Sequence, residues 1–183
     1  MCWNPLASTT ASNWVPLPKM KYGRHKAAAV VLDAKLYVAG GYNPKTHEFM
    51  DSVEVFDDVT QKWYRTSPLL NGGRAGHKIE AVDGKLYVMG GWRKFRFLDE
   101  VEEYDPLLEQ WTMKSKMPEK LAYFGSVVKN DQIYVVGGIS GFRNYDEKKD
   151  LIVYSPSRDV WAKVKPPMGV LRGKVSAVLA SDL

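Results

Sequence analysis

The residues best suited to chemistry in this sequence are arginines that stand close to aromatic side chains. The densest group is the run Trp92-Arg93-Lys94-Phe95-Arg96-Phe97. A guanidinium group forms charge-assisted hydrogen bonds with carboxylates and phosphates, and Arg, Tyr and Trp are enriched where proteins bind one another. Bulky side chains on a short loop can also pack over their own fold. We favour contact with a partner, so the run predicts binding of an acidic protein segment.

Catalytic and metal-binding chemistry finds little support in the sequence. His25, His47 and His77 lack the spacing of metal ligands. His25 and His77 each follow an arginine, and we interpret both as parts of a repeated pattern. Cys2 is the single cysteine and has no partner for a disulfide or a thiolate metal site. No nucleophile elbow, phosphate loop or zinc signature is present, so we expect no enzyme and no cofactor.

Composition narrows the class of protein further. The chain has 183 residues, of which 45% are hydrophobic, and a formal net charge of +5. Such a chain can bury a core, but its charge excess is modest and it carries no nucleic-acid-binding module. Residues 1–13 show neither the basic region nor the apolar region typical of a secretory leader, and no apolar run approaches the roughly 18 residues that a membrane span needs. We therefore expect a cytoplasmic protein, with the nucleus or the cytoskeleton as alternatives, that binds neither nucleic acid nor membrane.

The elements that position these residues follow from a repeat. Gly-Gly pairs begin at Gly40, Gly90 and Gly137, a period of about 50 residues, and each pair ends an apolar run: LYVAGG, LYVMGG or IYVVGG. A tryptophan recurs with the same period, and the last three are each preceded at seven residues by an aromatic residue. The tryptophans are Trp14, Trp63, Trp111 and Trp161, and the aromatic residues are Phe56, Tyr104 and Tyr154.

These three markers in register resemble the kelch repeat, most closely that of the BTB-kelch (kelch-like) proteins, over about Trp14 to Leu179. The resemblance implies an all-β fold, a β-propeller of four-stranded antiparallel blades. It also implies that the kelch part recruits a substrate to a cullin-3 ubiquitin ligase, while a BTB region, which this chain lacks, binds the cullin. An actin-binding cytoskeletal kelch protein is the alternative. A kelch-type copper radical oxidase would need a cysteine joined to a tyrosine within the blades, where Cys2 does not lie.

Each repeat is expected to form four strands, a to d. In the second repeat these are Lys78 to Val82, Lys85 to Met89, about Asp99 to Tyr104, and Gln110 to Lys114, with a hairpin turn at Asp83-Gly84. Blades buried on both faces explain the nearly continuous apolar strands. We assign the glycine pairs and the tryptophans to packing, because a crowded backbone excludes a Cβ and an indole buries a large area.

The repeats divide the chain into three complete blades with an orphan strand at each end. The expected boundaries are a tail at 1–12, an orphan strand d at 13–23, blades at 24–73, 74–120 and 121–171, and an orphan strand a at 172–183. BTB-kelch propellers usually have six blades, so this partial propeller cannot close its ring alone. We therefore expect a fragment, an unusual isoform or a truncated gene model, whose open blade faces self-associate.

The binding residues are expected on one rim. Antiparallel geometry places the d-to-a and b-to-c connections together, and few acids are expected at their tips. The resemblance implies that Arg24, Arg74 and Arg172, each of which begins a repeat, can point into a ligand mouth; the alternative is that they brace loops through backbone carbonyls. Leu121 breaks this pattern in the third repeat. The predicted partner contacts are Arg24, Arg74, Arg172, Trp92, Arg93, Phe95, Arg96, Tyr22, Tyr123, Phe142 and Arg143. As exposed loop charges, Arg74 and Arg93 are expected to contribute little to stability.

Overall fold

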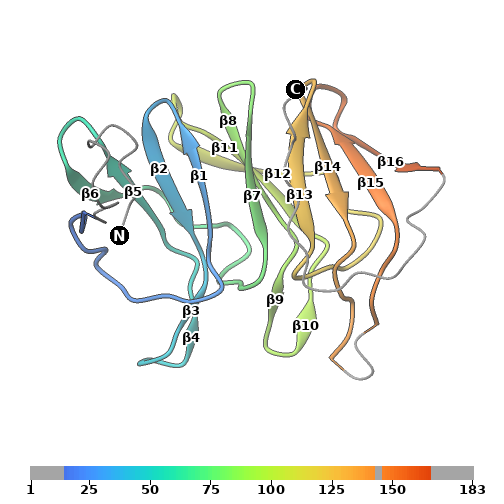
Figure 1. The fold of residues 1–183 in the computed structure, drawn as a ribbon, viewed down its shortest axis with the longest axis horizontal. Coiled ribbons are helices and arrows are strands. Elements are labelled where there is room, and N and C mark those ends of the chain that lie inside the picture. The colour runs from blue at the N-terminus through green and yellow to red at the C-terminus, as the bar shows by residue number, and fades with distance from the viewer. Residues whose placement is uncertain (1–14, 143–145, 166–183) are drawn as a thin grey trace, which may run out of the picture.

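The computed structural model describes residues 15–142 and 146–165, which form three four-stranded antiparallel sheets and two short hairpins (Figure 1). Blade 1 contains β1 (Ala28–Leu32), β2 (Lys35–Ala39), β5 (Val53–Asp57) and β6 (Lys62–Arg65). Blade 2 contains β7 (Lys78–Val82), β8 (Lys85–Met89), β11 (Val101–Asp105) and β12 (Gln110–Lys114). Blade 3 contains β13 (Gly125–Lys129), β14 (Gln132–Val136), β15 (Leu151–Ser155) and β16 (Val160–Val164), with a 3-10 helix, Pro156–Arg158, between its last two strands.

The strand order within each sheet is that of a meander, and the three edge strands β1, β7 and β13 lie next to one another (Figure 1). The all-β prediction is therefore confirmed, and β7, β8 and β12 have the predicted bounds. Strand c of blade 2 begins later than expected, because Asp99 and Glu100 belong to the connection before β11.

Equivalent tight turns join the first two strands of each blade. Both central residues have positive φ in each turn: 48° and 57° at Asp33-Ala34, 50° and 70° at Asp83-Gly84, and 51° and 56° at Asn130-Asp131. Two residues with positive φ are typical of the type I′ turn, whose twist matches that of the flanking strands. The predicted hairpin at Asp83-Gly84 is confirmed by the pairing of Val82 with Lys85.

The glycine pairs occupy crowded backbone, as predicted. Gly91 has φ +96°, and a Cβ there would lie 2.8 Å from the carbonyl oxygen of Ala75. At Gly138, with φ +94°, a Cβ would lie 3.0 Å from the carbonyl oxygen of Ala122. The second glycine of each pair therefore lets one blade's strand b pass close to the backbone that enters the same blade.

Apolar side chains fill the spaces between the blades in two clusters. One lies between blades 1 and 2 and includes Tyr37, Val55, Leu86 and Tyr104. The other lies between blades 2 and 3 and includes Met89, Phe124, Ile133 and Tyr154. Blade 2 contributes to both clusters and is therefore buried on both faces, which explains its nearly continuous apolar strands.

The three repeated tryptophans that the structure describes, Trp63, Trp111 and Trp161, pack as expected and also donate a hydrogen bond that the sequence did not reveal. Each indole Nε1–H reaches a carbonyl oxygen in the segment before its own blade: Trp63 to Pro18 at 2.7 Å, Trp111 to Ser67 at 3.0 Å, and Trp161 to Ser115 at 2.9 Å. Residues 15–21 thus occupy the same place before blade 1 that the end of blade 1 occupies before blade 2. Of the orphan strand d expected at 13–23, the structure describes residues 15–23, in which Val15 forms a β-bridge; the expected tail and the expected orphan strand a lie outside the described residues.

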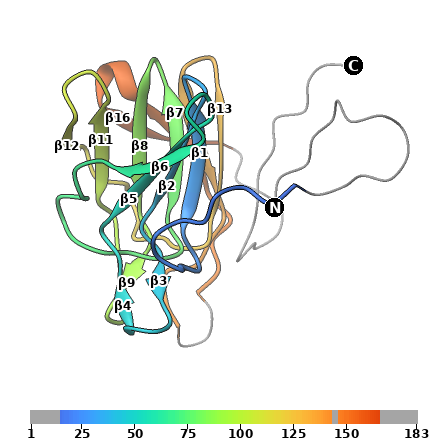
Figure 2. The ribbon, with the colours of Figure 1, turned by 90° about the vertical axis from the view of Figure 1, so that its left-hand side faces the viewer.

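The connections predicted to share a rim do so. The hairpins β3 (Tyr42–Asn43) with β4 (Glu48–Phe49), and β9 (Trp92–Arg93) with β10 (Arg96–Phe97), project from one end of the molecule (Figures 1 and 2). The d-to-a connections are bonded to the same region, since Arg74 N donates to Met50 O at 3.2 Å and Leu121 N to Leu98 O at 3.1 Å. We call this end, formed by residues 22–27, 40–52, 66–77, 90–100, 115–124, 137–142 and 146–150, the loop rim.

Candidate functional site on the loop rim

The repeat arginines Arg24 and Arg74 do not reach the surface of the loop rim. The side chain of Arg74 is 0% exposed and that of Arg24 is 1% exposed. Each guanidinium forms an ion pair with an acid in strand c of its own blade, Glu54 for Arg24 and Glu102 for Arg74. The expectation that these two arginines contact a partner is therefore wrong, because both guanidinium groups are buried and paired with acids inside the fold.

Each arginine instead fastens the loops of its blade. Arg24 donates to the carbonyl oxygens of Gly40 at 2.6 Å and Ser52 at 2.9 Å, and Arg74 donates to those of Gly90 and Glu100, both at 3.3 Å. The paired acid uses its other oxygen to accept a backbone N–H from the segment before the blade, Lys21 N at 2.8 Å for Glu54 and Leu70 N at 2.6 Å for Glu102. We call this arrangement of arginine, acid and backbone N–H the polar lock.

Blade 3 replaces all three parts of the polar lock. Leu121 stands where Arg74 stands, since Gly41 N donates to Arg74 O and Gly91 N to Leu121 O, both at 2.8 Å. Ile152 pairs with Val135 and Lys163 as Glu102 pairs with Val88 and Met113. Pro118, one residue after Met117 as Leu70 is one after Leu69, has no N–H to donate. Blade 3 thus lacks the arginine, the acid that pairs with the arginine, and the backbone N–H that donates to the acid.

The loop rim also carries more acid than expected. Its acidic residues are Glu48, Asp51, Asp99, Glu100, Glu119, Asp146, Glu147 and Asp150. Several neutralise cations: Lys116 lies 3.5 Å from Asp99, Lys148 lies 2.8 Å from Asp146, and Arg93 lies 3.6 Å from Glu100. The expectation of few acids is therefore wrong. Lys26, Lys45, Lys94 and Arg96 have no ion pair within the described part of the chain.

The feature that dominates the loop rim is a chain of aromatic rings, which we call the aromatic arc: Tyr42, Phe49, Trp92, Phe142 and Phe97. Successive ring centroids are 5.3, 4.8, 5.0 and 4.6 Å apart. The rings come from the b-to-c connections of all three blades, and most pairs meet edge to face, a favourable geometry. Phe142 is 40% exposed, and Tyr42, Phe49 and Trp92 are half-buried. Phe97 is buried, so the arc presents four of its five rings at least partly to the surface.

One cation, Lys26, lies over the aromatic arc. Its Nζ is 5.3 Å from the ring of Trp92 and 5.9 Å from that of Tyr123, distances at which a ring face attracts an ammonium group. The Trp92 Nε1–H donates to the hydroxyl of Tyr123 at 2.8 Å. Residues from blades 1, 2 and 3 thus meet at this point.

The predicted contact residues divide into three groups. Trp92, Tyr123 and Phe142 are brought together at the arc. Phe95, 88% exposed, and Arg96 stand on the β9–β10 hairpin, while Arg93 is half-buried and donates to the carbonyl oxygen of Asn71. Tyr22 lies apart, with the guanidinium of Arg65 4.6 Å from its ring. Arg143 and Arg172 lie outside the described residues.

Sequence reasoning missed Lys26 and left Tyr42 and Phe49 out of the predicted contacts. The signal for Lys26 was its place two residues after Arg24, as Gly76 is two after Arg74 and Tyr123 is two after Leu121. These three residues are equivalent, and all have positive φ, 57°, 62° and 57°. In the first repeat, the residue that reaches the arc therefore lies two residues beyond the selected Arg24.

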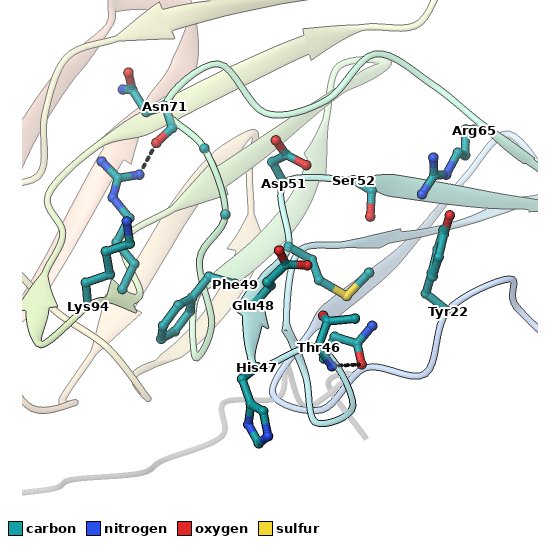
Figure 3. Close-up of a pocket in the computed structure, with 15 residues that line it drawn as sticks. Tyr22, Thr46, His47, Glu48, Phe49, Asp51, Ser52, Arg65, Asn71 and Lys94 are labelled. Carbon is teal, nitrogen blue, oxygen red and sulfur yellow. Dashed lines mark hydrogen bonds between the residues drawn. The ribbon is translucent and has the colours of Figure 1, made fainter.

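A groove adjoins the outer end of the aromatic arc. Its volume is about 880 Å³, and Phe49 belongs to both features. Tyr22 and Arg65 form one side of the groove, Asn71 and Lys94 the other, and Glu48 and Asp51 lie between them (Figure 3). The groove therefore offers both signs of charge at the seam of blades 1 and 2.

The histidines are not equivalent, contrary to the sequence interpretation. His25 bridges to Tyr42 as Ala75 bridges to Trp92 and Ala122 to Ile139. His77 therefore corresponds to Phe124, and it is a buried packing residue whose pKa is lowered to about 3, mainly by desolvation and further by Arg74. Within residues 15–142 and 146–165, no group of three side chains could hold a metal ion, and no helix is long and apolar enough to cross a membrane.

Comparisons with known proteins agree on the repeat family. The family model for the KLHDC2/KLHL20/DRC7 Kelch-repeats domain matches residues 4–181. Human Kelch-like protein 23 is 29% identical over 170 residues, which are 88% of this chain but 30% of the relative. Beta-scruin of Limulus polyphemus is 31% identical over 179 residues, 91% of this chain and 19% of the relative.

A solved structure, "Structure of YjhT", resembles the fold with a TM-score of 0.71 and 19% identity, over 81% of this chain and 52% of that one. The chain thus spans less than a third of the curated relatives named above. The glycine pairs, the tryptophan hydrogen bonds and the four-stranded meanders recur from blade to blade, and the family model covers nearly the whole sequence. The chain belongs to the kelch-repeat family and is similar to the kelch-like proteins.

Proposed function

We propose that this chain is a non-enzymatic protein-binding module that holds a partner segment against the loop rim. The observation that carries this proposal is the aromatic arc, whose rings span three blades and remain partly exposed. Contiguous exposed apolar surface rimmed by polar groups marks interaction sites, and large aromatic anchors contribute most of the energy in such interfaces. The groove of Figure 3 extends the same surface outward.

The finer role that we propose is substrate recognition within a BTB-kelch adaptor of a cullin-3 ubiquitin ligase, acting in the cytoplasm. Support comes from the similarity to kelch-like proteins. The matched residues of this chain span 30% of the length of Kelch-like protein 23. Binding of the cullin would then belong to a BTB region outside this sequence. An acidic partner segment fits Lys26, Lys94 and Arg96, three exposed cations of the loop rim that have no ion pair among the described residues, in place of the buried Arg24 and Arg74.

The test is a pull-down from cell lysate with the full chain as bait and mass spectrometry as readout. Wild type is compared with Lys26→Glu/Phe142→Ser on the loop rim. The matched control is Lys129→Glu/Leu107→Ser, which changes two exposed residues outside the loop rim. We expect specific partners that the rim variant loses and the control keeps. Equal capture by both variants would overturn the rim assignment. Co-sedimentation with actin filaments that depends on the same rim residues would favour the actin alternative.

A further inference from the structure

We infer that the segment bound at the aromatic arc carries one carboxylate side chain and one large apolar side chain two residues apart. The inference rests on the proposed function and assigns the carboxylate to Lys26 and the apolar side chain to the Trp92–Phe142 pair. It narrows the acidic segment of the proposed function to one carboxylate side chain, because Arg24 and Arg74, two of the cations expected to bind that segment, are buried.

Lys26 is an open cation. It is exposed and has no ion pair among the described residues, and its nearest attractive partners are the rings of Trp92 and Tyr123. An aromatic face attracts an ammonium group through its quadrupole but carries no net charge. The ammonium group of Lys26 therefore keeps its full charge for an incoming carboxylate.

The backbone holds this cation in place. Gly76 N donates to Lys26 O at 2.9 Å and Tyr123 N donates to Gly76 O at 2.8 Å, which links the three equivalent residues across three blades. A Cβ at Gly76 would lie 2.9 Å from Cε1 of Tyr123, so the missing side chain makes room for that ring. The Tyr123 hydroxyl in turn accepts from Trp92. The backbone that carries Lys26 and the two rings beside it are thus pre-organised, which lowers the entropy lost on binding.

The distances limit the spacing. Lys26 Nζ is 5.3 Å from the Trp92 ring centroid, and the Phe142 centroid is 5.0 Å from that of Trp92, so the ammonium group and the Phe142 ring lie at most about 10 Å apart. In an extended segment, residues i and i+2 point to one side and lie about 7 Å apart, whereas i and i+1 point to opposite sides and i and i+4 lie about 13 Å apart. A carboxylate on Lys26 and an apolar side chain on the exposed Phe142 edge therefore match a separation of two.

The experiment measures binding of synthetic peptides to the full chain by fluorescence anisotropy. Each peptide has a Gly/Ser background with one Glu and one Phe separated by one, two, three or four positions. All are N-acetylated and C-amidated, so the Glu side chain is the only carboxylate. A matched set carries Gln in place of Glu.

We expect the separation of two to bind most tightly and the change from Glu to Gln to weaken it about tenfold, the effect of one charge-assisted hydrogen bond. Lys26→Met should bring the Glu-to-Gln ratio to about one without changing the affinity of the Gln peptide. Lys45→Met, which removes an exposed lysine of the same rim, should leave the ratio unchanged. Phe142→Ser should weaken every peptide.

Three results would overturn the inference: a Glu-to-Gln ratio that survives Lys26→Met, affinity that does not depend on the separation, or no binding of any peptide. None of these three removes the proposed function, which the pull-down tests independently. Partner capture that ignores the rim variant, in contrast, would remove the proposed function itself.

Discussion

The polar lock around Arg74 offers a quantitative test, because blade 3 provides its natural replacement. Arg74→Leu leaves the Glu102 carboxylate, 0% exposed, without its guanidinium partner. Breaking one partner of a buried ion pair costs about 3–5 kcal/mol, a large share of the roughly 5–15 kcal/mol that stabilises a domain. Arg74→Leu should therefore strongly lower the free energy of unfolding.

The concerted change should behave differently. Arg74→Leu with Glu102→Ile removes both charges but leaves the Leu70 N–H without its acceptor, an orphan donor worth about 1–3 kcal/mol. Adding Leu70→Pro removes that donor and reproduces the Leu121, Ile152 and Pro118 set of blade 3. Replacing a buried ion pair by apolar side chains is often nearly neutral, so the triple variant should unfold within about 2 kcal/mol of wild type.

Urea unfolding followed by tryptophan fluorescence measures both effects, with Lys129→Ala, at an exposed residue that ends β13, as the control. The reasoning fails if the single variant is as stable as wild type, or if the triple variant is no more stable than the single one. The first outcome would mean that the lock contributes nothing, and the second that blade 3 compensates through other residues. The expectation from the sequence that Arg74 contributes little to stability as an exposed loop charge is wrong, since Arg74 is buried and Arg74→Glu would place a second carboxylate against Glu102.

Three further predictions concern other parts of the fold. Gly91→Ala should destabilise the chain by several kcal/mol more than Gly84→Ala in the same urea assay, because a Cβ at Gly91 meets backbone atoms whereas nothing lies within 4 Å of one at Gly84; equal losses would contradict the crowding argument. The folded state holds the pKa of His77 near 3, below its unfolded value of 6.5, so the unfolded chain gains a proton first and stability falls as pH drops from 6.5, by about 2 kcal/mol at pH 5. His77→Phe, which introduces the residue found at the equivalent position Phe124, should remove that slope between pH 6.5 and 5, and a slope unaffected by the change would refute this origin. The chain produced alone should self-associate through blade faces that expose Val31 (62%) and Val160 (47%), and sedimentation velocity showing only monomer at all concentrations would contradict this.

The strands and turns were predictable because they depend on local signals. The apolar run before each glycine pair and the Asp-Gly turn determine β7 and β8 within a few residues, and the period then extends the pattern to the other blades. The glycine pairs were also interpreted correctly, since crowding is a property of the repeat itself. Sequence alone therefore supplied the architecture.

The site was predicted less well, for a physical reason. Whether an arginine is exposed depends on which side chains surround it in the fold. The acids that pair with Arg24 and Arg74 are 30 and 28 residues away in strand c. The joint change to Leu121 and Ile152 was visible in the sequence, but only Leu121 was recognised as a departure. The bulky run at 92–97 was correctly placed on the rim, whereas its continuity with Phe49 and Phe142 required the spatial arrangement of three blades.

The polar lock and the tryptophan hydrogen bond also determine which residues must stay together when a repeat is duplicated or exchanged. Blade 2 depends on Ser67 and Leu70, which precede Arg74 and bond to Trp111 and Glu102. Blade 3 depends on Ser115, which bonds to Trp161, and on Pro118, which has no N–H group where Ile152 offers no acceptor. A recombination joint placed at the arginine would separate residues that must match, whereas a joint just after strand d would move them together. Chimeras joined after Arg65 or Lys114 should therefore keep the contacts between neighbouring blades. The unit that can be exchanged begins several residues before the arginine that opens the sequence repeat.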